Sequence, residues 1–341
     1  MSDIAPVPMD PNLPVDLAII GAGPTGLYAA FYAGLRHMSV KIIDSLEVLG
    51  GQLVTLYPEK FIYDVAGFPK VLAKDLATNL VEQGMQYGAI ACRGEQVQGL
   101  GYDPAAKIYT LITQKSRHRA RAILIAAGVG SFQPKTLTLP EVERFEGKGL
   151  HYFVKRVEDF RDHRVLIVGG GDSAVDWANM LAPVARQLTV IHRRNQFRAH
   201  EDSVAKMRDG RATVLTPFEL KSIGGTDRVE HAVVFENTSD AEQYFDVDDV
   251  VVNIGFDSSL GPIRDFGIEL EGAQIKVDSM MHTNLPGVFA AGDIATFPGK
   301  LKLIATGFGE ACIAVNFAKH HIDPAANVFP GHSSTMKDAK K

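Results

Sequence analysis

Apolar runs and segments of helical spacing alternate along the first part of the chain, and they predict a βαβ unit. Val15–Ile20 is an uninterrupted apolar run that ends in glycines, so it predicts a strand buried on both faces. Small and apolar residues at helical spacing predict a helix over 25–36. A second strand is predicted over 40–43, and it ends at Asp44. Residues 1–14 are a polar, proline-containing arm before this unit.

The same order of elements recurs later in the chain. Apolar runs predict strands over 165–168 and 188–192, and the spacing between them predicts a helix over 173–181. These elements form a second βαβ unit. The remaining patterns predict a helix over 72–84, antiparallel strands over 97–121, buried strands over 122–127, 232–235, 249–254 and 287–293, and a last helix over 306–321.

Both units carry a glycine-rich turn between their first strand and their helix. Glycine accounts for 32 of 341 residues, above the average of ~7%. In such turns the first glycine makes the bend, the second lets a pyrophosphate approach the backbone, and the third lets helix and strand pack closely. The helix N-terminus then supplies N–H groups to the phosphates. The motif residues are Gly21, Gly23 and Gly26 in the first unit, and Gly169, Gly171, Asp172, Ser173 and Ala174 in the second.

The ends of the second strands distinguish the two units. Asp44 lies 44 − 26 = 18 residues after the last motif glycine, and a carboxylate there accepts hydrogen bonds from a ribose. The first unit therefore fits FAD or NAD. Gly292 and Asp293 favour FAD, because a carboxylate after an apolar strand can point toward a flavin's ribityl chain.

The second unit carries cations at the equivalent position. His192 lies 192 − 174 = 18 residues after Ala174, and Arg193, Arg194 and Arg198 follow it. Guanidinium groups suit a 2′-phosphate, so this unit fits NADP better than NAD. A solvated strand end is the alternative interpretation for these arginines.

Composition and charge exclude several classes of protein. The chain has two cysteines, Cys92 and Cys312, so we expect neither a disulfide framework nor a cysteine-built zinc or iron–sulfur site. The net charge of −5 does not indicate nucleic acid, and the basic run 115–121 is interpreted as a solvated strand or turn. No apolar stretch is long enough for a membrane span, and the N-terminus has no signal-peptide pattern. We therefore expect a soluble cytoplasmic protein.

Taken together, these motifs resemble the flavoprotein reductases with two dinucleotide domains, which include thioredoxin reductase. The resemblance covers nearly the whole chain and implies two Rossmann-like domains of the three-layer ββα type, with the NADP domain inserted into the FAD domain. It implies an FAD domain of 1–132 and 257–341, which ends in a tail of 323–341, and an NADP domain of 133–256. Phe153 and Arg156 occupy the positions of the family's Cys-x-x-Cys pair, which argues against thioredoxin reductase activity.

The segment from Leu56 to Pro69 and the tail residues 332–334 resemble ferredoxin–NADP⁺ reductases of the thioredoxin-reductase-like type. This resemblance implies that Tyr57 stacks on one face of the flavin and that His332 covers the other. A core aromatic and a disordered tail residue are the alternative interpretations. The further FAD contacts that it implies are Thr25, Asp44, Gln52, Val97, Phe132, Asp293 and Ser334.

The resemblance implies hydride transfer from NADPH to flavin N5, followed by one-electron steps to ferredoxin or flavodoxin. It also implies a homodimer. No acid–base residue is needed, because the flavin carries out the chemistry and the protein positions it. Two alternatives stay open: an NADPH-dependent reductase of quinones, free flavins or oxygen, and a non-enzymatic flavin redox sensor.

Overall fold

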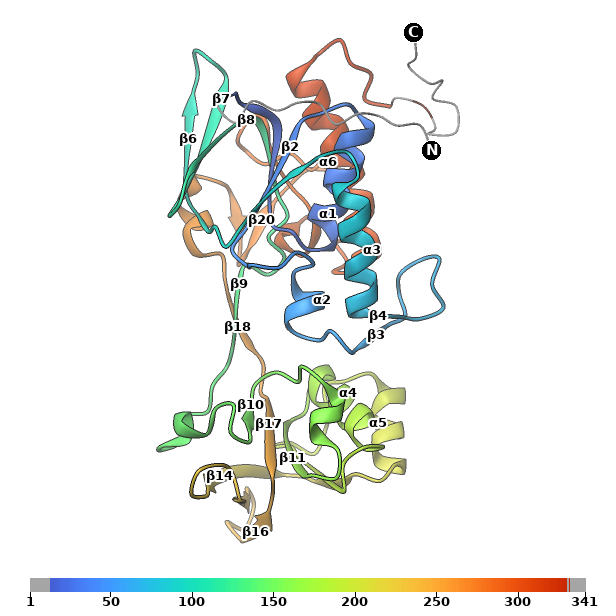
Figure 1. Cartoon of the computed structure of the whole chain (residues 1–341), viewed down its shortest axis with the longest axis vertical. Coiled ribbons are helices and arrows are strands. Elements are labelled where there is room, and N and C mark those ends of the chain that lie inside the picture. The colour runs from blue at the N-terminus through green and yellow to red at the C-terminus, as the bar shows by residue number, and fades with distance from the viewer. Residues whose placement is uncertain (1–12, 330, 332–341) are drawn as a thin grey trace. The chain divides into compact units, whose positions relative to one another are not determined.

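The computed structural model of the chain describes residues 13–329 and 331, and Figure 1 shows how its elements are arranged. The chain separates into two units: the first combines 1–131 with 258–341, and the second spans 132–257. Where the chain passes between them, β9 (Ser131–Pro134) and β18 (Phe256–Ser259) form a two-stranded sheet. Each unit is described separately below.

The first unit is built on a seven-stranded sheet in the order β5-β2-β1-β8-β7-β6, with β21 beside β8. Strands β5, β2, β1, β8 and β21 are parallel, whereas β6, β7 and β8 are antiparallel neighbours. Helices α1, α3 and α6 lie together on one side of the parallel strands, and β6 and β7 extend on the other (Figure 1). The bounds are β1 (Val15–Ile20), α1 (Pro24–Leu35), β2 (Val40–Asp44), α2 (Gln52–Thr55), β3 (Phe61–Ile62), β4 (Val71–Leu72), α3 (Ala73–Met85), β5 (Ile90–Arg93), β6 (Val97–Asp103), β7 (Ile108–Thr113), β8 (Arg117–Ile125), η3 (Gly261–Phe266), β19 (Leu270–Glu271), β20 (Gln274–Lys276), β21 (Val288–Ala290), η4 (Gly292–Ile294), β22 (Ala295–Thr296) and α6 (Ile304–Ile322).

The second unit has a five-stranded parallel sheet in the order β10-β17-β11-β12-β13 and a three-stranded antiparallel sheet, β14-β15-β16. Helices α4 and α5 lie on the side of the parallel sheet away from β14 and β16 (Figure 1). The bounds are η1 (Val142–Phe145), β10 (Leu150–His151), η2 (Val157–Phe160), β11 (Arg164–Gly169), α4 (Asp172–Leu181), β12 (Gln187–Ile191), α5 (Glu201–Asp209), β13 (Thr213–Leu215), β14 (Phe218–Gly224), β15 (His231–Glu236), β16 (Glu242–Asp246) and β17 (Asp249–Asn253).

Strand β8 corrects two of the sequence predictions. Its first half alternates exposed and buried residues and pairs antiparallel with β7, whereas its last four residues are all buried between parallel neighbours. The two patterns predict two strands, but one continuous strand changes its environment midway. The basic run was interpreted as solvated, which holds for Arg117, Arg119 and Arg121 but is wrong for His118, which is 5% exposed.

The predicted strand over 287–293 is also shorter than expected. Only Val288–Ala290 forms a strand, β21; Ala291 is still extended, and Gly292–Ile294 turns away as a 3-10 helix. Gly292 has a φ of +80°, a backbone conformation that side chains with a Cβ rarely adopt, so the strand ends there. Among the described residues, no helix combines the length and the apolar character needed to cross a membrane.

Candidate functional site

The first glycine turn joins β1 to α1 and is held by close backbone packing. Gly21 has a φ of +107°, and a Cβ added there would meet the carbonyl oxygen of Ala126 at 2.4 Å. A Cβ added to Gly26 would meet the carbonyl oxygen of Gly21 at 1.9 Å. These two glycines therefore serve the packing of the helix against the strand.

Asp44 connects the end of β2 to this turn. One of its carboxylate oxygens accepts the N–H of Ala22 at 2.5 Å, and the other accepts the N–H of Leu46 at 2.8 Å. The side chain is buried, and burial raises its pKa, although the two N–H groups oppose that shift. Each carboxylate oxygen keeps a second lone pair that a ribose hydroxyl can use.

The residues that precede α2 also pack against this first glycine turn. The N–H of Gly50 donates to the carbonyl oxygen of Ala22, and a Cβ added to Gly51 would lie 2.8 Å from the Cα of Gly23. Gln52 begins α2 and lies beside Gly128.

Tyr57 follows α2 and is half-buried. Burial raises its pKa to about 12, and the negative charges of Asp293 and Asp64 add to this effect. The structure thus brings Tyr57 within electrostatic reach of Asp293, although more than 230 residues separate them in the sequence.

A buried ion pair that no sequence pattern predicted supports the turn at Gly292. Glu310 on α6 accepts the N–H of Gly292 at 2.7 Å and also contacts the ammonium group of Lys300. The two charged side chains are only 5% and 7% exposed. A Cβ added to Gly292 or Gly307 would strike the hydroxyl of Thr25, so this turn, α6 and the start of α1 meet closely.

The second glycine turn joins β11 to α4 and repeats the packing of the first. A Cβ added to Gly169 would meet the carbonyl oxygen of Asn253 at 2.3 Å and the Cβ of Ala174 at 3.0 Å. The side-chain oxygen of Asn253 is buried here without a hydrogen-bond partner among the described residues. A buried polar atom without such a partner at the end of β17 fits a site that binds a polar ligand.

The middle glycines, Gly23 and Gly171, have a different reason to be glycine. Their φ values of −74° and −95° suit any L-residue, and an added Cβ would meet nothing within 4 Å. Each is the N-cap of a helix whose first N–H groups receive no side-chain cap. Neither backbone strain nor packing requires glycine there, so close approach by a ligand such as a pyrophosphate explains both.

The cations predicted for a 2′-phosphate gather around this second turn. Burial lowers the pKa of His192, and the charges of Arg193, Arg194 and Arg198 lower it further, which shows that the four groups lie close together. All three arginines are exposed, and within the described ranges their guanidinium groups have no ion-pair partner.

The segment that carries these arginines folds back over the turn. The N–H of Arg198 donates to the carbonyl oxygen of Gly170 at 2.7 Å, and the N–H of His200 donates to the carboxylate of Asp172 at 3.1 Å. Ser173 follows in the first turn of α4. Backbone contacts thus place exposed cations beside the uncapped N-terminus of α4.

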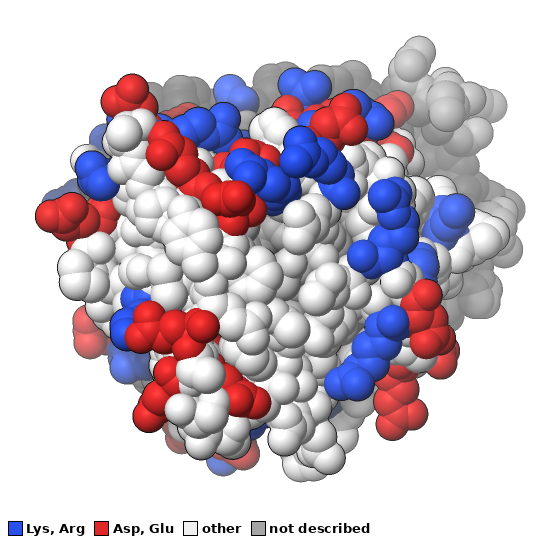
Figure 2. Space-filling model, turned by 90° about the horizontal axis from the view of Figure 1, so that it is seen from below, with Lys and Arg blue, Asp and Glu red and all other residues white. Residues whose placement is uncertain are grey.

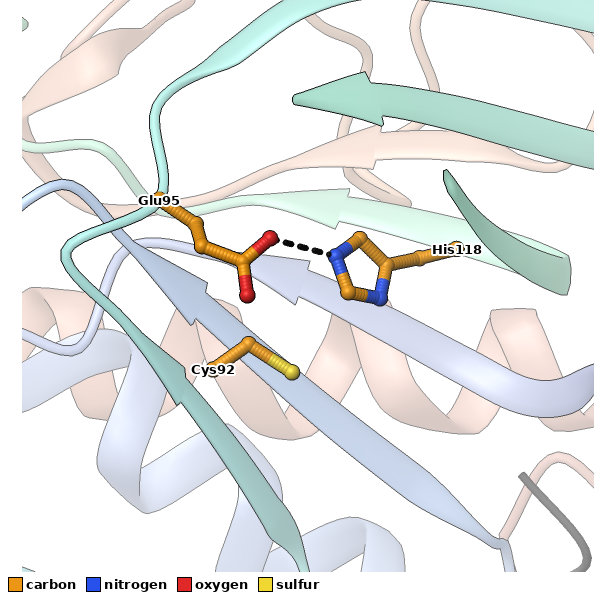
Figure 3. Close-up of side chains that lie close together, drawn as sticks. All are labelled: Cys92, Glu95 and His118. Atoms are coloured by element: carbon orange, nitrogen blue, oxygen red, sulfur yellow. Dashed lines mark hydrogen bonds and ion pairs between the residues drawn. The ribbon is translucent and has the colours of Figure 1, made fainter. Parts of the chain in front are cut away.

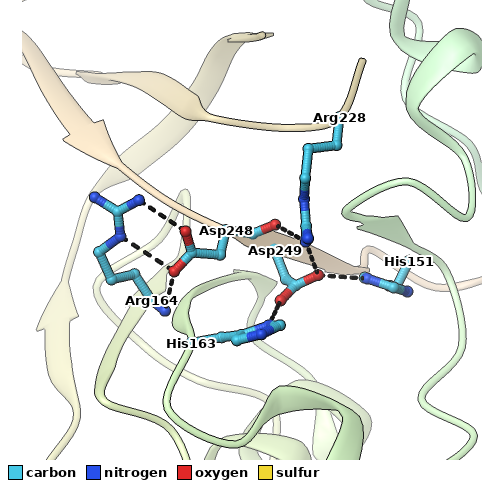
Figure 4. Close-up of polar contacts among 6 residues, drawn as sticks. All are labelled: His151, His163, Arg164, Arg228, Asp248 and Asp249. Carbon is cyan, nitrogen blue, oxygen red and sulfur yellow. Dashed lines mark hydrogen bonds and ion pairs between the residues drawn. The ribbon is translucent and has the colours of Figure 1, made fainter. Parts of the chain in front are cut away.

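The opposite end of the same sheet carries a charged cluster of its own, drawn in Figure 4. The carboxylate of Asp249 lies 2.8 Å from His151 Nε2 and 2.6 Å from His163 Nδ1. Arg164 binds the neighbouring carboxylate of Asp248 through its side chain and its backbone N–H. Arg164 begins β11, whereas the glycine turn follows its end, so this cluster stabilises the sheet away from the candidate site.

Other predicted residues are placed as follows. Val97 is buried at the start of β6. Phe132 lies in β9, but its side chain is outside the described part, and His332 and Ser334 lie outside the described residues altogether. Both cysteines are free in the structure.

Comparison with known proteins adds to this geometry. A ferredoxin–NADP reductase of Halalkalibacterium halodurans is 52% identical over 322 residues, which cover 94% of this chain and 97% of that protein. The ferredoxin–NADP reductase 2 of Bacillus licheniformis is 50% identical over 325 residues, with coverage of 95% and 98%. The resemblance inferred from the motifs is therefore confirmed.

Solved structures give the same fold. The thioredoxin reductase of Lactococcus lactis is 25% identical with a TM-score of 0.77, over 90% of this chain and 99% of that one. The T. acidophilum enzyme of the same name, 24% identical, has a TM-score of 0.78 over 92% and 99%. The predicted class, two dinucleotide-binding α/β domains, is thereby confirmed. The pyridine nucleotide-disulphide oxidoreductase family matches residues 15–311, and the chain belongs to this family.

Proposed function

We propose that the chain is a ferredoxin–NADP reductase, a flavoprotein that transfers electrons between NADPH and ferredoxin or flavodoxin. The observation that carries this proposal is the pair of glycine turns, each with an open middle glycine and an uncapped helix N-terminus. The names of relatives about 50% identical support the acceptor. The absence of a cysteine pair directs the electrons to an outside partner rather than to an internal disulfide.

In this proposal FAD binds in the domain formed by 1–132 and 257–341. The N-terminus of α1 and the open position at Gly23 would hold its pyrophosphate, and Asp44 would bind a ribose hydroxyl. Asp293 would face the ribityl chain, and Tyr57 would lie against the flavin ring. The remaining contacts would come from Thr25, Gln52, Val97, Phe132, His332 and Ser334.

NADP binds in the domain formed by 133–256. The N-terminus of α4 and the open position at Gly171 would hold its pyrophosphate, while Arg193, Arg194 and Arg198 would bind the 2′-phosphate. FAD, when bound, supplies the chemistry that accepts a hydride and releases single electrons. The chain's own residues orient the two dinucleotides, and none of them needs to act as a general acid or base.

The acceptor surface is a separate matter. An acidic partner such as a ferredoxin is attracted by a local basic area rather than by net charge. The face in Figure 2 carries lysines, arginines and acidic residues scattered around an uncharged centre. We therefore do not place the acceptor on this face. The family resemblance also supports a homodimer in the cytoplasm, and light scattering of the purified protein tests the dimer.

The deciding experiment compares electron acceptors. The purified protein should be yellow, and NADPH should bleach its flavin under anaerobic conditions. Ferredoxin or flavodoxin, coupled to cytochrome reduction, should then turn over faster than quinone, free flavin or oxygen. A colourless protein that never binds flavin would falsify the proposal. Faster turnover with quinone or oxygen would instead favour the alternative reductase, and bleaching without turnover with any acceptor would favour a sensor.

A further inference from the structure

A second kind of chemistry gathers at the edge of the first unit, where β5, β6 and β8 meet. Cys92 lies on β5, Glu95 lies in the turn between β5 and β6, and His118 lies on β8. One ligand atom from each side chain, the thiol sulfur, a carboxylate oxygen and an imidazole nitrogen, lies within 4.8 Å of the other two. Figure 3 shows that the three side chains point toward one another.

Two of the three residues already form a buried pair. His118 Nε2 lies 2.9 Å from Glu95 Oε2, and the hydroxyl of Thr113 donates to the same oxygen at 2.7 Å. The side chains of His118 and Glu95 are only 6% and 11% exposed. The hydrogen bonds within this pair compensate for the burial of its two polar side chains. They do not account for the thiol that faces the pair.

Cys92 is the unexplained member of the cluster. It is half-buried, and among the described residues no hydrogen bond joins its sulfur to Glu95 or His118. Thiolate, imidazole and carboxylate are the three ligand types of protein zinc sites. Tetrahedral ligand atoms lie ~3.3–3.6 Å apart when metal–ligand bonds measure ~2.0–2.3 Å. To reach this geometry the sulfur would move inward by about 1 Å, and the two atoms of the Glu95–His118 pair, now 2.9 Å apart, would separate slightly.

We propose that Cys92, Glu95 and His118 form a three-ligand site for a thiophilic divalent cation of the zinc class, with a fourth position open to water. A thiolate and a carboxylate balance the two charges of the ion, and a sulfur ligand selects against calcium and magnesium, which prefer oxygen. From the two cysteines we expected no metal site and no cysteine-built zinc site, and this proposal departs from that expectation with one cysteine and two ligands of other kinds.

Metal binding also requires that the ligand atoms lose their protons. The ion replaces the thiol proton of Cys92, which passes to the solvent. It also takes the place of any proton on His118 Nε2, which the ring can carry on Nδ1 instead. The half-buried position of Cys92 leaves a path for the ion to enter.

An ion bound at this site would also stabilise the end of β2, the strand that carries Asp44. The N–H of Glu95 donates to the carbonyl oxygen of Asp44 at 2.8 Å, and Cys92 is paired in register with Ile43 on β2. A bound ion would therefore join β5, β8 and the turn that contacts Asp44.

Cobalt(II) is the probe, because a thiolate bound to it gives an intense charge-transfer absorption that a protein without a cobalt–sulfur bond lacks. The experiment uses the full-length flavin-containing protein, without a histidine tag and freed of metal by a chelator. Difference spectra that subtract the flavin should show one cobalt ion per chain with this absorption. Zinc should displace it, and either ion should raise the melting temperature.

Three variants locate the ion. Cys92→Ser should lose the absorption, and His118→Gln, which can still donate to Glu95, should weaken cobalt binding at least ~10-fold. Cys312→Ser is the matched control, because Cys312 is the other half-buried free cysteine, and it should bind as the wild type does. The proposal is overturned if the wild type shows no cobalt–sulfur absorption, if Cys92→Ser keeps it, or if Cys312→Ser loses it. Circular dichroism of the metal-free variants verifies that they fold.

Discussion

The two glycine turns share their packing but differ in what surrounds them. In the first, a buried carboxylate, Asp44, binds the backbone of the turn itself, and a buried ion pair holds the adjoining turn at Gly292. In the second, the charged groups are exposed arginines with no ion-pair partner in the described part of the chain. The first site is therefore fixed in advance, whereas the second keeps its charges free for a ligand.

In the proposed function this difference has a clear meaning. A cofactor that stays bound benefits from a rigid, buried site, because little ordering remains to oppose its binding. A substrate that must leave after each turnover benefits from exposed, exchangeable contacts. The predictions below test this contrast, beginning with the first site.

The largest effect is expected from Lys300→Met. It leaves the carboxylate of Glu310 buried without its cation, and breaking a buried ion pair in this way costs about 3–5 kcal/mol of unfolding free energy. Because Glu310 holds the N–H of Gly292, flavin content should fall as well. Urea unfolding and the flavin-to-protein ratio measure both effects. Lys302→Met, at an exposed neighbour, is the control, and equal losses in the two variants would contradict the role of the pair.

The second site should respond in affinity rather than in stability. Arg193→Ala combined with Arg194→Ala removes two charge-assisted contacts of at least ~1.5 kcal/mol each, so KM for NADPH should rise about 100-fold or more. KM for NADH and flavin content should change little. Arg211→Ala, an exposed arginine elsewhere in the unit, is the control. Equal losses with NADPH and NADH would count against a 2′-phosphate site.

Local patterns predicted the elements that carry these two turns. Buried parallel strands and small helix residues leave a strong signal, and β1 and β2 begin and end within one residue of the predicted positions. The polar helix α5 was not predicted, because it buries only Met207 and has few apolar positions to mark its inner face.

Contacts between distant segments were beyond the reach of the sequence. Lys300 precedes α6 and Glu310 lies within it, and nothing in their spacing shows that they pair in the interior or that Glu310 reaches the N–H of Gly292. The burial of His118 is a second example, since its ring contacts Glu95, which lies 23 residues earlier in the turn between β5 and β6.

The middle glycines offer a test in which stability and binding should move in opposite directions. Gly23→Ala and Gly171→Ala introduce a methyl group into open space at permitted backbone angles. Each should leave the cofactor-free protein as stable or more stable by about 0.4–1 kcal/mol. The added methyl group should crowd the bound ligand at a cost of ~1–3 kcal/mol and so weaken its binding about 10-fold or more. The affected ligand should be FAD for Gly23→Ala and NADPH for Gly171→Ala. Each variant is the other's control, and a loss of both ligands in either one would show that the turns are not separate sites.

The smallest effect concerns how the second unit is stabilised at the end of β11 away from its glycine turn. Arg164 holds the pKa of Asp248 at about 2, below its ordinary value of 3.8. A carboxylate whose pKa is lowered by folding stabilises the folded state at pH values above its ordinary pKa of 3.8. This stabilisation is lost as the pH falls toward 2, the pKa in the folded state. Asp248→Asn should therefore cost about 1 kcal/mol at neutral pH, after allowance for solvent screening, and the difference from the wild type should shrink between about pH 4 and pH 2.

Urea unfolding across this pH range measures that difference. Asp246→Asn is the control, because its exposed carboxylate lies 3.6 Å from the same guanidinium and should contribute less than about 0.5 kcal/mol. A difference for Asp248→Asn that stays constant down to pH 2 would mean that its ion pair with Arg164 does not stabilise the sheet. The two units would then differ further, because the first would still depend on a buried ion pair and the second would not depend on this one.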